Sequence, residues 1–173
     1  MPDLRRLIDA VYAGSTSRDS MLHGEGHWKC VAWTGSELAD HVPRCDRAAV
    51  LLFALLHDTQ RLNDGHDPRA ASFARDLHAR GLIAPPAETL ELLCDACHDH
   101  TAGTTSDDPT VGTCWDADRL NLWRVGMRPD PRWLSTTPAK DPARIQRSRR
   151  CEGNHRTWEQ LLEITPRPSA GAG

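Results

Sequence analysis

The sequence predicts an all-α fold, and three observations favour it. Apolar residues recur at the three-to-four-residue spacing of amphipathic helices in several separate segments. Prolines and glycines fall mainly between those segments, where helices begin and end. No series of alternating apolar and polar residues indicates a set of strands. With 173 residues the chain can form one core, so we expect a single domain over 1–165 and a flexible tail over 166–173.

The first three helices can be placed from their apolar faces. Residues 4–12 have amphipathic spacing, and Gly14 ends that helix. A second helix is expected over 27–38. Asp46 is expected to cap a third helix, whose run over 48–56 is apolar on nearly every face. A helix that is apolar all round belongs in the centre of a domain.

The rest of the chain is divided by turn residues into shorter segments. The remaining expected elements are, in chain order, a loop over 63–68, a helix from Pro68 to Gly81, a helix that opens at Pro85-Pro86, a polar loop over 103–109, a helix over 110–125, a proline-broken stretch of short turns over 129–142 and a helix over 156–164.

Composition restricts the classes of partner. The formal net charge is -3, so no basic surface for stable binding of a nucleic-acid duplex is indicated. No apolar run is long enough to span a bilayer, and the N-terminal residues lack the apolar core of a signal peptide. We therefore expect a soluble, cytoplasmic protein without membrane contact. The sequence leaves the oligomeric state open, a homodimer included.

The six cysteines do not predict a disulfide framework. A chain of this length without an export signal argues against disulfides. Cys94 and Cys97 form a lone CxxC with no second ligand pair at zinc-site spacing. We expect both to be core residues on one helix face.

Three places in the sequence put metal-ligand residues where a helix should be apolar. His27 lies on the apolar stripe of the second helix, and the third helix ends directly in His57-Asp58. In the helix that follows the polar loop, Asp118 lies on the apolar stripe, whereas Asp116 points the other way. A buried aspartate is costly unless its charge is compensated, and a divalent cation compensates it directly.

The donor set indicates which metal ions fit. Two imidazoles and two carboxylates suit one divalent transition metal (Mn²⁺, Fe²⁺, Co²⁺, Ni²⁺ or Zn²⁺) better than Ca²⁺ or Mg²⁺. Four protein ligands leave room for a water molecule that could serve as a nucleophile. The alternative is that His57-Asp58 is an ordinary hydrogen-bonded pair at a helix end.

Taken in order, these motifs resemble the HD superfamily of metal-dependent phosphohydrolases. The matching pieces are His23-Gly-Glu-Gly-His27-Trp28, Leu55-Leu56-His57-Asp58 and Trp115-Asp116-Ala117-Asp118-Arg119-Leu120. The resemblance covers about 22–126. It implies an HD-type helical bundle with a metal site between its central helices. It also implies hydrolysis of phosphate mono- or diesters, often of nucleotides, with His27, His57, Asp58 and Asp118 as the metal ligands.

The sequence departs from one well-known branch of that superfamily. In the guanosine-tetraphosphate hydrolases, acidic residues follow the His-Asp pair by three and four positions. Arg61 and Leu62 stand there in this chain, so the same substrate is not expected. Arg61 could instead clamp a phosphate oxygen, and a surface salt bridge is the alternative.

Other candidates for catalysis and substrate binding lie near these motifs. His66 and Asp67 follow the His-Asp pair closely and could act on a metal-bound water together with Asp58 and Arg61, although turn formation is the alternative. Arg119 and Asn121 are the further candidates for substrate contact.

A second metal ion is an open alternative. His98 and His100 flank the apolar stripe of their helix, and His100 is the preferred extra ligand because it precedes a turn that resembles the family's site-lining loop. Some members of the superfamily hold two metals with additional histidines, including cyclic-dinucleotide phosphodiesterases and mixed-valence di-iron oxygenases. Only His66, His98 and His100 are available here, so one metal is favoured.

Three hypotheses for function follow. The first is a metal-dependent phosphohydrolase acting on a small phosphorylated metabolite, a nucleotide in particular. The second is a di-iron oxygenase on the same scaffold, and the third is a metal-binding module without turnover. The basic run from Arg147 to Arg150 is expected to be a solvated surface cluster that could attract an anionic substrate.

Overall fold

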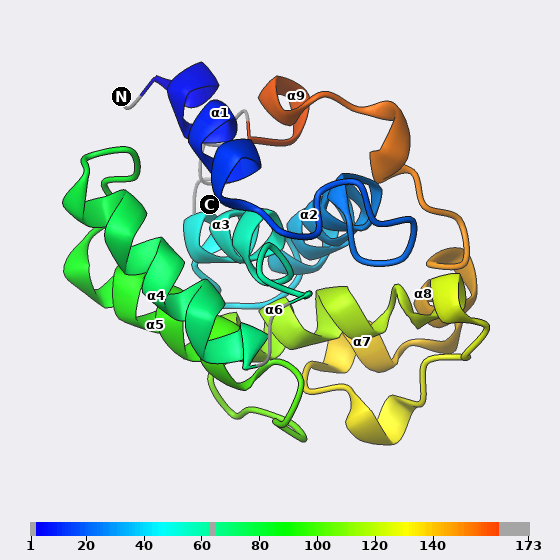
Figure 1. Ribbon diagram of the computed structural model, residues 1–173. Coiled ribbons are helices and arrows are strands. Elements are labelled where there is room, and N and C mark those ends of the chain that lie inside the picture. Colours follow the sequence, from blue (N-terminus) through cyan, green and yellow to red (C-terminus); the bar gives the residue numbers. More distant parts are fainter. Residues whose placement is uncertain (1–2, 63–64, 163–173) are drawn as a thin grey trace.

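The computed structural model describes residues 3–62 and 65–162, and the regular structure in these ranges is entirely helical (Figure 1). The predicted all-α class is confirmed. The elements are α1 (Leu4–Gly14), α2 (Glu25–Ala39), α3 (Arg47–Leu56), α4 (His66–Ala79), α5 (Ala87–Asp99), α6 (Pro109–Arg119), η1 (Leu122–Val125), η2 (Pro131–Trp133), α7 (Thr137–Lys140), α8 (Pro142–Arg147), η3 (Gly153–His155) and α9 (Trp158–Leu162).

Helix α3 lies at the centre of the bundle, as its apolar sequence predicts. It packs against α2, α4, α5 and α6, and the residues from Phe53 to Leu56 are fully buried. Helices α4 and α5 form an antiparallel hairpin on one side, while α7 and α8 lie beyond α6 on the other (Figure 1). Burial of so much apolar surface is the main driving force that holds α3 in place.

Aspartate caps fix the starts of α1, α3 and α6. Asp3, Asp46 and Asp108 each accept hydrogen bonds from two main-chain N–H groups at the starts of α1, α3 and α6. The cap predicted at Asp46 is therefore confirmed. Asp46 also accepts a 2.6 Å hydrogen bond from Thr89 in α5, and its N–H donates to Thr110 in α6 at 2.9 Å. This cap thus ties the start of α3 to both neighbouring helices.

The prediction of one continuous helix over 110–125 is wrong. Helix α6 ends at Arg119, and 122–125 form a separate 3-10 turn. The Asn121 side chain donates a 2.7 Å hydrogen bond to the carbonyl of Ala117, so it competes with the main-chain bond that would continue the helix. Gly126 then closes the turn with a φ of 75°, a left-handed conformation that favours glycine.

The cysteines differ from expectation in one respect. Cys30 in α2 and Cys151 after α8 form a disulfide with a Cα–Cα distance of 5.4 Å, so the expectation of no disulfides is wrong. No local spacing indicates this pairing, because 121 positions separate the two residues. Cys94 and Cys97 are buried core residues, as predicted.

The ends of the chain are only partly covered by the described residues. The last predicted helix, over 156–164, is found as α9 from Trp158 to Leu162. Residues 163 and 164 of the predicted helix and the tail predicted over 166–173 lie outside the described ranges. The domain boundary predicted at residue 165 therefore stays a prediction. Within those ranges, no helix has the length and apolar character needed to cross a membrane.

Candidate metal centre

Four predicted ligand residues meet between α2, α3 and α6. The Nε2 atoms of His27 and His57 are 3.2 Å apart, and His27 Nε2 is 3.0 Å from Asp118 Oδ1. Asp58 Oδ2 lies 3.7 Å from both imidazole Nε2 atoms. The atoms offered by His27, His57 and Asp58 all lie within 4.8 Å of one another, a spacing that could hold one metal ion. Asp118 adjoins this group from α6.

The end of α3 positions the His-Asp pair. His57 directly follows the last helical residue and keeps right-handed helical backbone angles. Its ring stacks on Phe53 with the centroids 4.8 Å apart, and it is fully buried. Ser17 donates a hydrogen bond to the main-chain carbonyl of Asp58, which fixes the turn that follows. The buried helix therefore places the side chains of His57 and Asp58 in the interior of the protein.

Main-chain carbonyls orient two of the imidazoles. His57 Nδ1 lies 3.2 Å from the carbonyl oxygen of Phe53, and His100 Nδ1 lies 2.9 Å from that of Cys97. A carbonyl only accepts, so each Nδ1 carries the proton and donates it. In the neutral ring of His57, Nε2 is then left with a lone pair directed into the site. This is the arrangement by which proteins fix metal-binding histidines.

Charge and burial in the site fit a cation. Burial lowers the pKa of His57 to about 4, so its imidazole is neutral at ordinary pH. Burial alone would raise the pKa of Asp58, but His57, His100 and His23 outweigh it and lower that pKa. Burial would likewise raise the pKa of Asp118, but the neighbouring His27 outweighs burial and lowers that pKa. Neutral imidazoles and charged carboxylates are the forms that bind metal.

Three buried atoms in the site lack hydrogen-bond partners. They are His27 Nδ1, His100 Nε2 and Asp118 Oδ1, and all three are inaccessible to solvent. Unsatisfied buried polar atoms are costly, at about 1–3 kcal/mol each. A divalent cation held by His27, His57 and Asp58 would lie beside Asp118 Oδ1 and satisfy that atom, so the residues present fit a metal ion.

Asp58 also takes part in a second cluster. Its Oδ1 atom is 3.6 Å from His100 Nε2, and Asp58, His66 and His100 offer ligand atoms that all lie within 4.8 Å of one another. His66 is the first residue of α4, so this second cluster includes a residue from a helix that does not contribute to the first cluster. Asp58 is thus shared, with one carboxylate oxygen facing each cluster.

Arg61 projects into the second cluster. One of its guanidinium nitrogens contacts His66 Nε2 and lies 3.9 Å from Asp58 Oδ1. A fixed positive charge therefore stands beside the atoms that a second metal ion would need. Asp67 is close by, 2.6 Å from His66 Nε2, but its carboxylate also accepts hydrogen bonds from the N–H and hydroxyl of Thr101. Asp67 thereby fastens the turn after α5.

The structure does not bring every predicted residue to the centre. The side chain of His98 is 58% exposed and pairs with Asp99 at 2.8 Å. Arg119 donates to the main-chain carbonyls of Gly103, Thr104 and Trp133, so its donors are directed at the protein backbone. These two residues are therefore poorly placed for the metal and substrate roles predicted for them.

Two residues near the centre were not among the predicted site residues. His23 precedes α2, and its Nδ1 lies 3.0 Å from Asp58 Oδ2. Its position four residues before His27 was a usable indication, since that spacing would put both residues on one face of a helix. Arg124 has a guanidinium nitrogen 3.7 Å from Asp118 Oδ1. Nothing in the sequence indicated Arg124, because its placement depends on the break after α6.

Comparison with known proteins identifies the class of fold. No family model matches the sequence, and no curated protein matches it. The structure is similar to the crystal structure of a predicted HD superfamily hydrolase from an uncultured Thermotogales bacterium, with a TM-score of 0.65 and 25% sequence identity over 85% of each chain. The chain therefore has an HD-domain fold, and the likeness extends beyond the motif region at 22–126.

Proposed function

We propose that this protein is a divalent-metal-dependent phosphohydrolase that acts on a small phosphorylated metabolite, a nucleotide mono- or diester in particular. The observation that carries the proposal is the buried set of imidazoles and charged carboxylates around Asp58, three of whose atoms lack any hydrogen-bond partner. The structurally similar Thermotogales protein is described as a predicted hydrolase, which is consistent with this class of reaction.

The proposal assigns three tasks to residues of the chain: metal binding, phosphate binding and proton transfer. His27, His57, Asp58 and Asp118 would hold the ion, which when bound supplies charge stabilisation and a water molecule of lowered pKa. Arg61 lies beside Asp58 with its guanidinium available to bind a phosphate oxygen. His66 contacts Arg61, and in this proposal it would accept or return a proton next to the bound phosphate.

The direct test is phosphate release by the protein loaded with one metal at a time. Metal-free protein is reconstituted with Mn²⁺, Fe²⁺, Co²⁺, Ni²⁺ or Zn²⁺ and assayed against a panel of nucleotide mono- and diesters. We expect hydrolysis of at least one ester that disappears in Asp58→Asn. Tight metal binding without hydrolysis across the panel would instead favour a metal-binding module without turnover.

The cluster of Asp58, His66 and His100 favours one alternative function, a di-iron oxygenase. That function requires two irons per chain and consumption of O₂ with an organic substrate. Iron analysis and an oxygen electrode separate the two hypotheses. One metal per chain and no O₂ uptake would exclude the oxygenase, whereas two irons with substrate-dependent O₂ uptake would replace the hydrolase proposal.

A further inference from the structure

A cavity of about 460 Å³ adjoins the metal centre, and its volume is in the range of small-molecule sites. His27 lines one part of it. Another part is lined by the turn that follows α6 and by the segment after α8. The described lining residues include two arginines, Arg124 and Arg149, and no carboxylate. The cavity is therefore positively charged next to a cluster of acidic metal ligands.

Arg124 connects the cavity to the metal centre. Its Nε donates a 2.8 Å hydrogen bond to the carbonyl of Leu22, and a terminal nitrogen donates to that of Asn121 at 3.1 Å. The other terminal nitrogen lies 3.7 Å from Asp118 Oδ1. The guanidinium is thus held by two carbonyls between the metal ligand and the cavity.

Arg149, in the segment after α8, supplies the second positive charge. Its guanidinium carbon lies 5.7 Å from the centroid of the Trp123 ring. Trp123 is itself fixed, because its Nε1 lies 3.2 Å from both the carbonyl of Ile145 and the hydroxyl of Ser148. Arg149 therefore belongs to a wall of ordered contacts, although its own side chain is exposed.

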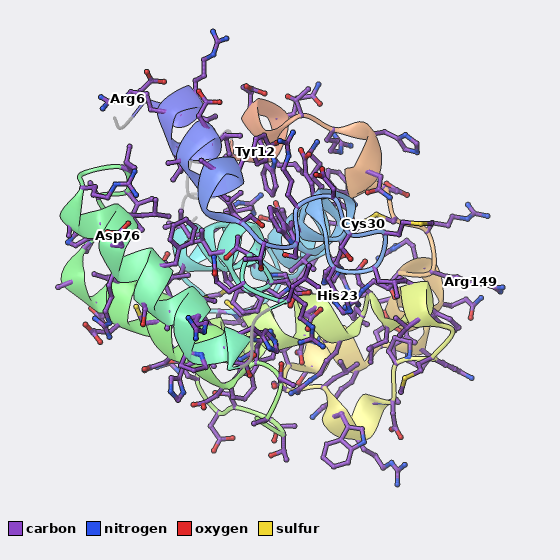
Figure 2. All side chains as sticks on the ribbon, in the orientation of Figure 1. Arg6, Tyr12, His23, Cys30, Asp76 and Arg149 are labelled. Atoms are coloured by element: carbon purple, nitrogen blue, oxygen red, sulfur yellow. A yellow bond between two sulfur atoms is a disulfide. The ribbon has the colours of Figure 1, made fainter. Side chains whose placement is uncertain are left out.

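The wall that carries Arg149 is fastened to α2. The Cys30–Cys151 disulfide joins it to the helix one turn beyond His27, and Figure 2 shows Cys30 and Arg149 on the same side of the molecule. Gly153 lies so close to α2 that a Cβ there would overlap the carbonyl of Lys29. This covalent and steric attachment gives the cavity a defined shape.

We infer that this cavity binds the part of the substrate beyond the phosphate at the metal centre, and that this part carries a second anionic group between Arg124 and Arg149. The group is a phosphate or a carboxylate, the anions that guanidinium groups bind with paired hydrogen bonds. The inference rests on the proposed function only for the position of the first phosphate. It narrows the substrate class to small phosphate esters with two anionic groups.

The test compares two ligands that differ by one phosphate. Adenosine 5′-monophosphate and adenosine 3′,5′-bisphosphate are titrated calorimetrically into the metal-loaded protein, and the recovered ligand is analysed for hydrolysis. Because hydrogen bonds to charged groups contribute about 1.5–3 kcal/mol, we expect the bisphosphate to bind roughly tenfold or more tightly. Arg149→Ala should remove most of that preference. Arg150→Ala, next in sequence but outside the lining, should retain it.

A second variant tests the attachment of the wall. Cys151→Ser breaks the disulfide without altering either arginine, so it should lower the preference for the bisphosphate while the metal content stays unchanged. No preference in the wild type, or equal loss in Arg149→Ala and Arg150→Ala, would overturn the inference even if hydrolysis occurs. A preference that depends on Arg149 without any hydrolysis would support the anionic subsite and contradict the proposed function.

Discussion

Asp58 directs its two carboxylate oxygens to two different sets of partners. Oδ2 faces His23, His27 and His57, whereas Oδ1 faces His100 and Arg61. One buried side chain therefore contacts five residues from three segments of the chain. Its low pKa keeps it charged, and His57, His100 and His23 are the partners that lower this pKa against the effect of burial.

Asp58→Asn should remove metal binding. The amide keeps the volume but loses the charge and one oxygen ligand. Loss of an outer-shell partner alone costs about 10–100-fold in affinity, so we expect a loss of at least about 100-fold for this direct ligand. Metal content by mass spectrometry checks it, with the exposed Asp99→Asn as the matched control. Unchanged metal content in Asp58→Asn would exclude the site.

Arg61 should limit the centre to one ion per chain. Its guanidinium lies against His66 and Asp58, so a second cation there meets charge repulsion. We expect wild type to bind one Mn²⁺ and Arg61→Ala to bind a second, whereas Arg61→Lys retains the positive charge and stays at one. Two ions bound by the wild type at equilibrium would contradict this role for Arg61.

The order of the motifs in the sequence indicated the candidate ligand residues, but burial alone does not distinguish Asp118 from Asp116. Asp116 is fully buried, deeper than Asp118, whose side chain is 18% exposed. Three hydrogen bonds from Ser135 and Thr136 compensate Asp116 without a metal. Those partners come from a segment some twenty positions away, so no helical spacing could have distinguished the two aspartates.

At the scale of elements, the close approach of α2 to α3 and α6 sets the geometry of the centre. Gly35 in α2 lies where a Cβ would come within 2.6 Å of Val50 in α3 and 3.3 Å of Ala117 in α6. The three helices that carry His27, the His-Asp pair and Asp118 therefore meet around one residue without a side chain.

Gly35→Ala should destabilise the protein by about 1–3 kcal/mol, because the extra methyl group forces these helices apart. Helix propensity alone would stabilise the same substitution by about 1 kcal/mol, so the sign of the change identifies the cause. Chemical denaturation measures it. A more stable variant would show that α2 and α3 can separate at little cost.

The sequence predicted where most helices lie, but it did not predict where every helix ends. Helices α2 and α3 begin and end within two residues of the predicted ranges. The helix expected over 110–125 breaks because the side chain of Asn121 reaches a main-chain carbonyl of its own helix. Apolar spacing continues through that break, so periodicity cannot locate it.

For the whole molecule, the metal ion should contribute to stability. The ligands come from α2, from the end of α3 and from α6, so they are together only in the folded state. An ion present at 100 times its dissociation constant adds about 2.7 kcal/mol, which corresponds to roughly 5–10 °C in Tm for a chain of this length. Thermal unfolding with and without chelator measures the shift. The Tm of Asp58→Asn should not respond to the chelator, and an equal response would assign the shift to another site.

The disulfide gives the chain a closed covalent topology. Cys30 and Cys151 enclose His57, Asp58, His66, His100 and Asp118 in one ring, with His27 just outside it. A single proteolytic cut within the ring, such as in the connection between α5 and α6, would leave both pieces covalently joined. Such a nicked molecule would keep its mass on a non-reducing gel, retain its ligand residues in one particle and separate into two fragments only on reduction.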